Sequence, residues 1–263
     1  MTAFCYARHV RFLALAGLIS LGLGTLCLQA RAADPDALWK IVDGQCAAHL
    51  REGGDPSPCV KLDPNPGAGI AVLKDRNGIA QFLLIPTARL SGIENPELLF
   101  DNAPNYWVYA WQAKTFVEER LHKTLARDQV ALAINSAYGR SQRQLHIHID
   151  CIRPDVRDML RRHIGEIGER WAPLGDSLAG HAYWSRRILG AELGKNDPFK
   201  LLAEGMASAA QHMDAQTLVL TGATFEDAGE GFVLLVDHVD PLALDRASGE
   251  ELLDHDCAIA ARQ

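Results

Sequence analysis

Apolar and polar residues follow one another along the chain in two kinds of pattern, and the first kind predicts β-hairpins. Residues 69–87 contain two apolar runs separated by Asp75-Arg76-Asn77-Gly78, and an Asn-Gly pair between apolar runs is a strong signal for a tight hairpin turn. Residues 130–134 form another apolar run, and residues 144–151 alternate polar and apolar side chains with the period of a strand. We therefore expect two antiparallel strand pairs.

The second kind of pattern has helical spacing. It predicts helices over residues 105–123, which we expect to pack on the sheet, and over residues 155–171. A short helix is expected over residues 35–46, and Asp197-Pro198 should cap and begin a helix that runs to about Met213. Antiparallel strands with packed helices predict an α+β fold.

The other segments carry weaker signals. Residues 59–69 are rich in Pro and Gly and predict a loop, whereas residues 216–221 and 231–236 predict a hairpin joined by a longer loop. Two hairpin-and-helix sets are compatible with a duplicated fold, although no repeat is visible in the sequence. Residues 181–187 leave two interpretations open, a substrate-facing basic patch or a surface turn.

The first 32 residues predict an export signal. Arg8 and Arg11 precede an uncharged apolar run over residues 12–28, and Ala30-Arg31-Ala32 follows it. The triplet favours cleavage, whereas the length of the run favours a retained anchor with a cytoplasmic N-terminus. We expect a membrane anchor followed by one exported domain, residues 33–263, with a cleaved form as the alternative.

Composition excludes two classes of protein. The chain is 48% hydrophobic and 22% charged, which is not the composition of a disordered protein. Its formal charge is −7, and the first 32 residues hold three arginines and no acid, so the exported part carries −10. We therefore expect no nucleic-acid partner. The oligomeric state is left open.

Four cysteines follow the export signal, an even number in a compartment that permits disulfides. Cys46 and Cys59 bracket a short loop and are the expected pair, which leaves Cys151 to join Cys257 and hold the C-terminus beside the strand at residues 144–151. Free buried thiols are the alternative.

The strand Gln144-Leu145-His146-Ile147-His148-Ile149-Asp150 places two imidazoles on one face. They could be a polar pair turned to solvent, or two zinc ligands, although only Asp150 offers a third ligand nearby. Upstream, residues 135–142 form a polar turn that brings a glycine, a hydroxyl and a guanidinium to the strand edge, all suited to an anion. Phosphoryl or nucleotidyl transfer is the chemistry that this combination favours.

These motifs carry a family resemblance. The turn Gly139-Arg140-Ser141 followed by His-x-His resembles the active-site strand of the histidine-triad superfamily of nucleotidyl hydrolases and transferases. Residues 131–156, residues 72–86 and Asp254-His255-Asp256-Cys257 are similar to the bacterial CDP-diacylglycerol pyrophosphatases. The resemblance covers nearly the whole exported chain, and it implies an α+β, histidine-triad-like antiparallel sheet with packed helices.

The resemblance implies roles for individual residues. His146 takes the place of the nucleophile and His148 that of the phosphate-binding histidine, while Gln144 stands where the superfamily has its first histidine. This register puts Ser141 near the leaving group. If the alignment with the superfamily were shifted by one step, His148 would be the nucleophile and Asp150 would take the third position of the triad.

The resemblance implies hydrolysis of CDP-diacylglycerol, a membrane lipid, to CMP and phosphatidate through a nucleotidyl-histidine. It also favours a retained anchor in the bacterial inner membrane, with the catalytic domain in the periplasm and a cleaved periplasmic form as the alternative. Phosphate-binding residues would be Ser141, Arg140, Asn135 and Gln144, and no metal or other cofactor is expected. Two alternatives are a histidine-triad hydrolase or transferase that acts on a soluble nucleotide, and a periplasmic module that binds a metal or ligand.

Overall fold

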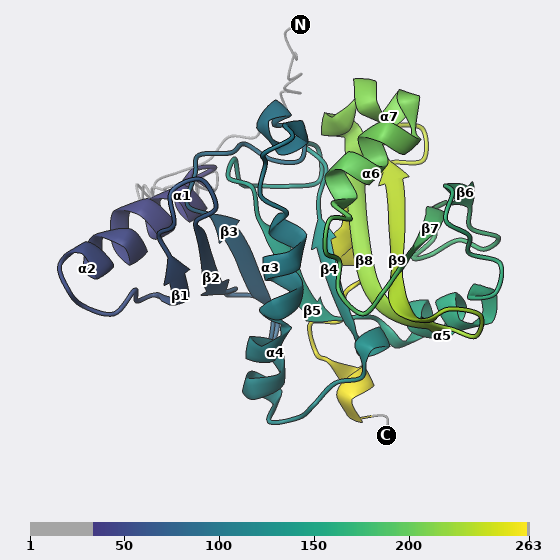
Figure 1. Cartoon of the computed structure of the whole chain (residues 1–263), viewed down its shortest axis with the longest axis horizontal. Coiled ribbons are helices and arrows are strands. Elements are labelled where there is room, and N and C mark those ends of the chain that lie inside the picture. Colours follow the sequence, from purple (N-terminus) through teal and green to yellow (C-terminus); the bar gives the residue numbers. More distant parts are fainter. Residues whose placement is uncertain (1–33, 262–263) are drawn as a thin grey trace, which may run out of the picture. The chain divides into compact units, whose positions relative to one another are not determined.

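A computed structural model describes residues 34–261 of the chain (Figure 1). The predicted signal or anchor at residues 1–32 lies outside this part. Within it, no helix combines the length and the apolar character that crossing a membrane would require. The fold is α+β, as predicted, and all its strands belong to one antiparallel sheet.

The sheet has nine strands in the spatial order β1-β2-β3-β5-β4-β8-β9-β7-β6. The strands are β1 (Cys59–Asp63), β2 (Ile70–Lys74), β3 (Phe82–Pro86), β4 (Val130–Ile134), β5 (Ile147–Cys151), β6 (Ala172–Pro173), β7 (Trp184–Leu189), β8 (Gln216–Phe225) and β9 (Gly229–His238). The helices are α1 (Ala37–Ile41), α2 (Ala47–Arg51), α3 (Tyr106–Gln112), α4 (Lys114–Leu121), α5 (Pro154–His163), α6 (Pro198–Gly205) and α7 (Ala207–Gln211). Shorter helical turns are η1 (Val42–Cys46), η2 (Pro96–Leu99), η3 (Arg127–Gln129), η4 (Met213–Ala215), η5 (Gly249–Leu252) and η6 (Ala258–Ala261).

The chain order and the sheet order repeat. The N-terminal half comprises β2, β3, α3, α4, β4 and β5, and its strands lie in the order β2-β3-β5-β4. The C-terminal half comprises β6, β7, α6, α7, β8 and β9, and its strands lie in the equivalent order β6-β7-β9-β8. The halves join through antiparallel pairing of β4 with β8, so the two hairpin-and-helix sets expected from the sequence form one continuous sheet.

Aromatic side chains fill one face of this sheet, which α3, α4 and α6 cover. Trp111 of α3 meets Phe232 of β9 with ring centroids 5.0 Å apart, and Trp107 meets Phe199 of α6 at 5.4 Å. Phe82 of β3 contacts Phe116 of α4 in the same way. Burying rings of this size is a major source of stability, and it leaves the opposite face of β5 available for polar side chains.

Three predicted elements have different limits in the structure. Residues 59–69 were expected to be a loop, but Cys59–Asp63 forms β1 on the edge of β2. The helix predicted over residues 105–123 is divided at Ala113 into α3 and α4. The helix predicted over residues 155–171 ends after His163, and Gly165 and Gly168 follow, which disfavour its continuation.

The second half of the chain also departs from the expectations. Residues 181–187 are not simply a surface turn, since Trp184–Leu189 forms β7 beside β9. Within β7, Arg186 lies over the Trp171 ring and Arg187 forms an ion pair with Asp227. The helix expected to run to Met213 is divided into α6 and α7. The predicted hairpin of β8 and β9 is present, but its strands are longer and only residues 226–228 connect them.

Both predicted disulfides are confirmed. Cys46 in η1 is bonded to Cys59 in β1, and Cys151 at the end of β5 is bonded to Cys257 near the C-terminus. Each bond ties a peripheral segment to the sheet.

Candidate active site

His146 and His148 lie side by side, as the alternation of residues 144–151 predicts. Their ring centroids are 4.9 Å apart in an edge-to-face arrangement, and both residues are buried, with 7% and 4% of their surface exposed. On the sheet, His148 pairs with Leu83 of β3 and Ala133 of β4. Directly paired residues lie on the same face, so these three residues mark what we call the histidine face.

Two segments cover the histidine face on either side of the pair. Val42 and Cys46 of η1 pack against Leu83 and neighbouring apolar residues. On the other side η5 lies on β4 and β8, at Gly249, where an added Cβ would lie 2.8 Å from the Val219 side chain. Glycine therefore lets η5 approach the sheet closely beside the histidines.

The hydrogen bond of His146 determines which ring nitrogen is free. Its Nδ1 lies 2.7 Å from the backbone oxygen of Gln144, and a carbonyl can only accept, so Nδ1 carries the hydrogen. Nε2 then keeps its lone pair. Burial lowers the pKa of His146, so the ring is neutral at neutral pH and Nε2 has the character of a nucleophile.

His148 has the complementary tautomer. The Gln81 side-chain nitrogen donates to Nδ1 of His148 at 2.7 Å and lies 3.4 Å from the Glu250 carboxylate. With Nδ1 accepting, the hydrogen is on Nε2, which is buried and without a hydrogen-bond partner in the described structure. Burial and the neighbouring His146 hold the pKa of His148 well below its usual value. The pair thus offers one lone pair and one N–H donor.

Asn135 holds Glu250 beside His148. Its side-chain nitrogen donates to the Glu250 carboxylate at 2.6 Å, and its oxygen accepts from the Glu250 backbone nitrogen at 3.3 Å. Asn135, expected to bind phosphate, is therefore engaged with η5. Glu250 also approaches Nδ1 of His148 to 3.3 Å. Sequence reasoning missed Gln81 and Glu250, because they lie 67 and about a hundred residues from the histidine strand and no local pattern connects them to it.

The structure does not bring the side chains of Arg140 and Gln144 into this cluster. Arg140 makes a two-pronged contact with Glu94 at 2.8 and 2.6 Å, although its charge is among the causes that lower the pKa of His146. Gln144 donates to the backbone oxygens of Pro86 and Ala88 at 3.0 and 2.8 Å and so holds the end of β3. Ser141 lies exposed in the turn.

Asp150 is the next residue on the histidine face. It is fully buried, and its Oδ2 lies 2.8 Å from Nδ1 of His255, while Oδ1 accepts from the Cys151 backbone. The contact raises the pKa of His255. The C-terminal motif that contains His255 thus lies beside β5. Among described residues, the clusters with metal-ligand geometry contain neither His146 nor His148, so the geometry gives the zinc interpretation of that pair no support.

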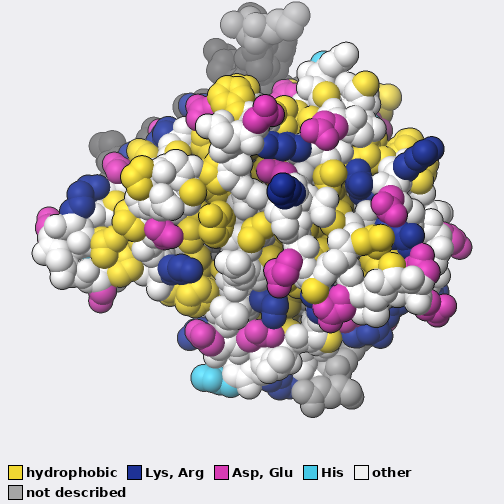
Figure 2. Space-filling view, viewed as in Figure 1, with side chains coloured by type: hydrophobic (Ala, Val, Ile, Leu, Met, Phe, Trp, Pro, Cys, Tyr) yellow, Lys and Arg dark blue, Asp and Glu magenta, His cyan; other side chains and the backbone are white. Residues whose placement is uncertain are grey.

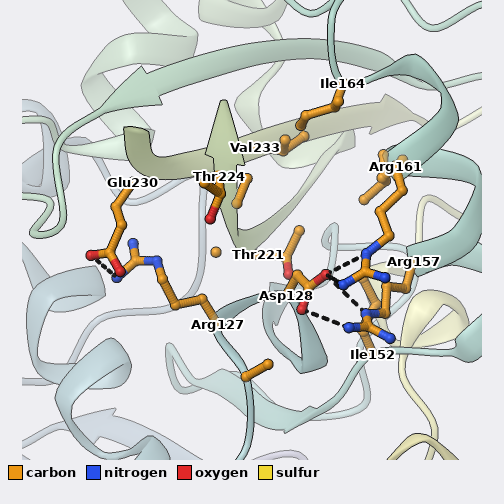
Figure 3. Close-up of a pocket in the computed structure, with 14 residues that line it drawn as sticks. Arg127, Asp128, Ile152, Arg157, Arg161, Ile164, Thr221, Thr224, Glu230 and Val233 are labelled. Atoms are coloured by element: carbon orange, nitrogen blue, oxygen red, sulfur yellow. Dashed lines mark hydrogen bonds and ion pairs between the residues drawn. The ribbon is translucent and has the colours of Figure 1, made fainter. Parts of the chain in front are cut away.

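A separate cavity of about 460 Å³ lies between α5 and strands β8 and β9 (Figure 3). Arg157 and Arg161 both bind Asp128 at its rim, and Arg127 reaches Glu230. The residues that line this cavity do not include His146 or His148. These arginines therefore belong to a different part of the molecule from the histidine pair. Over the face seen in Figure 2, acidic and basic side chains are interspersed rather than gathered into a field of one sign.

Sequence comparison relates the chain to characterised families. A sequence model of the CDP-diacylglycerol pyrophosphatase family matches residues 33–261. A protein from Yersinia pestis named CDP-diacylglycerol pyrophosphatase is 45% identical over 242 residues, which cover 92% of this chain and 91% of that protein. Both halves of the sheet and the histidine pair lie within the region that the family model matches.

Proposed function

Since the chain belongs to the CDP-diacylglycerol pyrophosphatase family, we propose that it hydrolyses the pyrophosphate bond of CDP-diacylglycerol to CMP and phosphatidate at His146 and His148. The observation that carries this proposal is the adjacent pair of buried imidazoles, in which the Gln144 carbonyl leaves Nε2 of His146 with a free lone pair. From the contact between the Gln81 amide nitrogen and Nδ1, we assign the hydrogen of His148 to Nε2, where it can be donated to an oxygen on phosphorus.

In the first step, Nε2 of His146 attacks the phosphorus that bears the cytidine. The N–P bond forms while the P–O bond to the bridging oxygen breaks, and phosphatidate leaves with that oxygen and the electron pair. The Gln144 carbonyl stabilises the positive charge that develops on the His146 ring, because it accepts from Nδ1–H. His148 donates from Nε2 to an oxygen on phosphorus, where negative charge grows.

In the second step, water attacks the same phosphorus and the N–P bond breaks. The electron pair returns to Nε2 of His146, CMP leaves and the water's proton passes to solvent. Two displacements through a covalent intermediate replace one difficult displacement. Gln81 and Glu250 are positioning residues in this scheme, since they hold His148 and do not touch phosphorus. Ser141 and the Gly139–Ser141 backbone are proposed to face the leaving group.

We also propose that the fold is histidine-triad-like. The repeated strand-strand-helix-strand-strand order, with a histidine strand inside one half, supports this classification. In such a scheme the reaction needs no metal at the histidine pair.

For location, we propose that residues 1–32 anchor the protein in the inner membrane with the catalytic domain in the periplasm. The two disulfides support an oxidising, extracytoplasmic compartment. Membrane fractionation followed by sequencing of the mature N-terminus tests this. A mature chain that begins near residue 33 and washes off the membrane at high pH would establish the cleaved form instead.

The central experiment incubates the purified protein with CDP-diacylglycerol in detergent micelles, labelled on the phosphorus next to cytidine. We expect CMP and phosphatidate as products, and label on His146 after rapid acid-free denaturation. A soluble nucleotide anhydride is the comparison substrate. Faster turnover of the soluble compound would favour the alternative hydrolase, and absence of turnover with either substrate would favour a binding module.

A further inference from the structure

A second group of titratable side chains lies in the C-terminal half, away from the histidine pair. Asp237 at the end of β9, Asp245 in the loop after it and His181 before β7 each direct a ligand atom to a common point, with all three atoms within 4.8 Å of one another. Glu251 of η5 adjoins them, because its Oε1 lies 2.8 Å from His181 Nδ1 and accepts from the Tyr183 hydroxyl at 2.7 Å. We call these four ionisable residues the carboxylate cluster.

The carboxylate cluster is buried and its negative charges are poorly matched. Asp237 and Asp245 are only 3% and 5% exposed. In the described part of the chain, no lysine or arginine forms an ion pair with Asp237, Asp245 or Glu251. Arg153 donates to the backbone oxygen of Glu251, and its charge is paired with Asp155. Three carboxylates therefore face a single imidazole.

One oxygen of Asp237 shows where a positive charge is missing. Oδ1 accepts from the His238 backbone at 2.7 Å, whereas Oδ2 is buried and receives no hydrogen bond from residues 34–261. A buried carboxylate oxygen without a donor is costly. Burial and the neighbouring Asp245 raise the pKa of Asp237 to about 7, so a shared proton is the competing occupant of this position.

The spacing of the donor atoms suits a metal ion. Nδ1 of His181 lies 3.4 Å from Oδ2 of Asp245. It also donates to Oε1 of Glu251 at 2.8 Å, so a metal that binds at Nδ1 displaces this hydrogen. In a tetrahedral zinc site with bonds of about 2.0 Å, neighbouring ligand atoms lie roughly 3.3 Å apart. Imidazole nitrogen and carboxylate oxygen are donors that Zn²⁺ and Mn²⁺ accept, whereas Mg²⁺ and Ca²⁺ prefer oxygen alone.

We propose that His181, Asp237 and Asp245 form a binding site for a divalent transition metal, Zn²⁺ in the first instance. Bound there, the ion neutralises the buried carboxylates and joins the end of β9 to the loop after it and to the segment before β7. Glu251 would remain beside the ion as the acceptor of the Tyr183 hydroxyl. The site is independent of the proposed reaction, because neither His146 nor His148 belongs to it.

The test is calorimetric titration of Zn²⁺ into the untagged, chelator-treated full chain, with Mn²⁺, Mg²⁺ and Ca²⁺ as comparison ions. We expect one equivalent of Zn²⁺ to bind with a dissociation constant below about 10 µM. At a hundredfold excess of free ion over that constant, the melting temperature should rise by about 5–10 °C. Absence of binding at 100 µM protein would overturn the proposal and leave a proton-sharing network in its place.

Matched variants locate the site. Asp237→Asn and His181→Gln should each weaken Zn²⁺ binding at least about tenfold, with circular dichroism to verify folding. Asp176→Asn is the control, because Asp176 also contacts a histidine, His163, but on the surface. A His146→Ala/His148→Ala double variant should bind Zn²⁺ like the natural chain. Loss of binding in that double variant or in Asp176→Asn, with retention in Asp237→Asn, would place the ion elsewhere.

Discussion

The two halves of the sheet share one topology but carry different side chains on their equivalent inner strands. In the N-terminal half, β5 places His148 and Asp150 on the histidine face, and Asp150 pairs with Ala131 of β4. The strand predicted over residues 144–151 begins only at Ile147, so His146 directly precedes β5. In the C-terminal half, Asp237 of β9 pairs in the same way with Thr217 of β8. Both aspartates accept a hydrogen bond from the next backbone nitrogen, at 2.8 and 2.7 Å.

Counted back from these aspartates, the positions of the two histidines are occupied in β9 by Val233 and Leu235, both buried. Val233 lines the cavity beside α5. The same backbone therefore serves packing in one half and presents polar rings in the other. The comparison teaches that the repeat supplies the strand geometry, and that the residues at two alternate positions decide whether that geometry can support chemistry.

The largest effect is expected for His146→Ala, which should reduce CDP-diacylglycerol hydrolysis by about 10⁴-fold or more, because it removes the proposed nucleophile. Val233→Ala is the matched change in the other half and should cost about 1–3 kcal/mol of stability with kcat preserved. CMP release under single-turnover conditions measures the first and urea unfolding the second. If His148→Ala abolishes turnover while His146→Ala retains most of it, the nucleophile is His148.

The two disulfides provide the next comparison. Cys151→Ser/Cys257→Ser opens a loop with a sequence separation of 106, and should cost about 4–5 kcal/mol in a chain-entropy account. Cys46→Ser/Cys59→Ser opens a loop with a separation of 13 and should cost about 3 kcal/mol. Urea unfolding of both variants gives the ranking. A larger loss for the shorter loop would contradict it and indicate that η1 depends on its bond more than the C-terminus does.

His148→Ala should lower the hydrolysis rate by about 10²–10³-fold, the usual cost of losing one donor to a developing oxyanion. The effect should appear in kcat, because the donor acts mainly as charge develops. Gln81→Leu tests the tautomer without touching the ring, since it frees Nδ1 of His148 and should lower kcat less than His148→Ala. An unchanged kcat in both variants would remove His148 from the mechanism.

A smaller effect is expected at the helix caps of the two halves. Asn105 caps α3 and Asp197 caps α6, each with a side-chain oxygen that accepts from the backbone two residues on. Burial raises the pKa of Asp197 to about 6, so the folded state binds its proton more tightly than the unfolded state. Stability from this group is present below pH 4 and is lost as the pH rises to about 6.

Asp197→Asn gives α6 the same uncharged cap residue that α3 has, and it removes the loss of stability that accompanies ionisation of Asp197. Above pH 6 the variant should be more stable than the natural chain by about 1–3 kcal/mol, and near pH 4 the difference should vanish. Urea unfolding at pH 4 and pH 8 measures both values. An equal difference at the two pH values would mean that Asp197 does not titrate between them.

Local patterns in the sequence predicted the parts of the fold that depend on local structure. The Asn77-Gly78 turn identified the β2–β3 hairpin, and alternation around His146 and His148 placed both rings on one face. The parts that depend on distant contacts were missed. Cys59–Asp63 forms a strand by pairing with the edge of β2. The Pro and Gly residues between positions 59 and 69 led us to predict a loop there instead.

The site shows the same division. The histidine pair could be predicted because the two residues are only two positions apart in the sequence. Gln81, which directly precedes β3, and Glu250 of η5 are distant in sequence and meet His148 only in the folded chain. Arg140 and Gln144 were expected to bind phosphate from their types alone. Arg140 contacts Glu94, and Gln144 contacts carbonyl oxygens at the end of β3 and after it. These partners depend on how residues 135–144 pack in three dimensions, which cannot be predicted from a single sequence.

The bond between Cys151 and Cys257 has a consequence for when the fold of the site is closed. It holds the last turn of the chain against the strand that bears the histidines, next to the contact between Asp150 and His255. In the reducing cytosol this covalent closure cannot persist. On the proposed route of export, the chain would therefore gain this tie between its C-terminus and the histidine strand only after it leaves the cytosol.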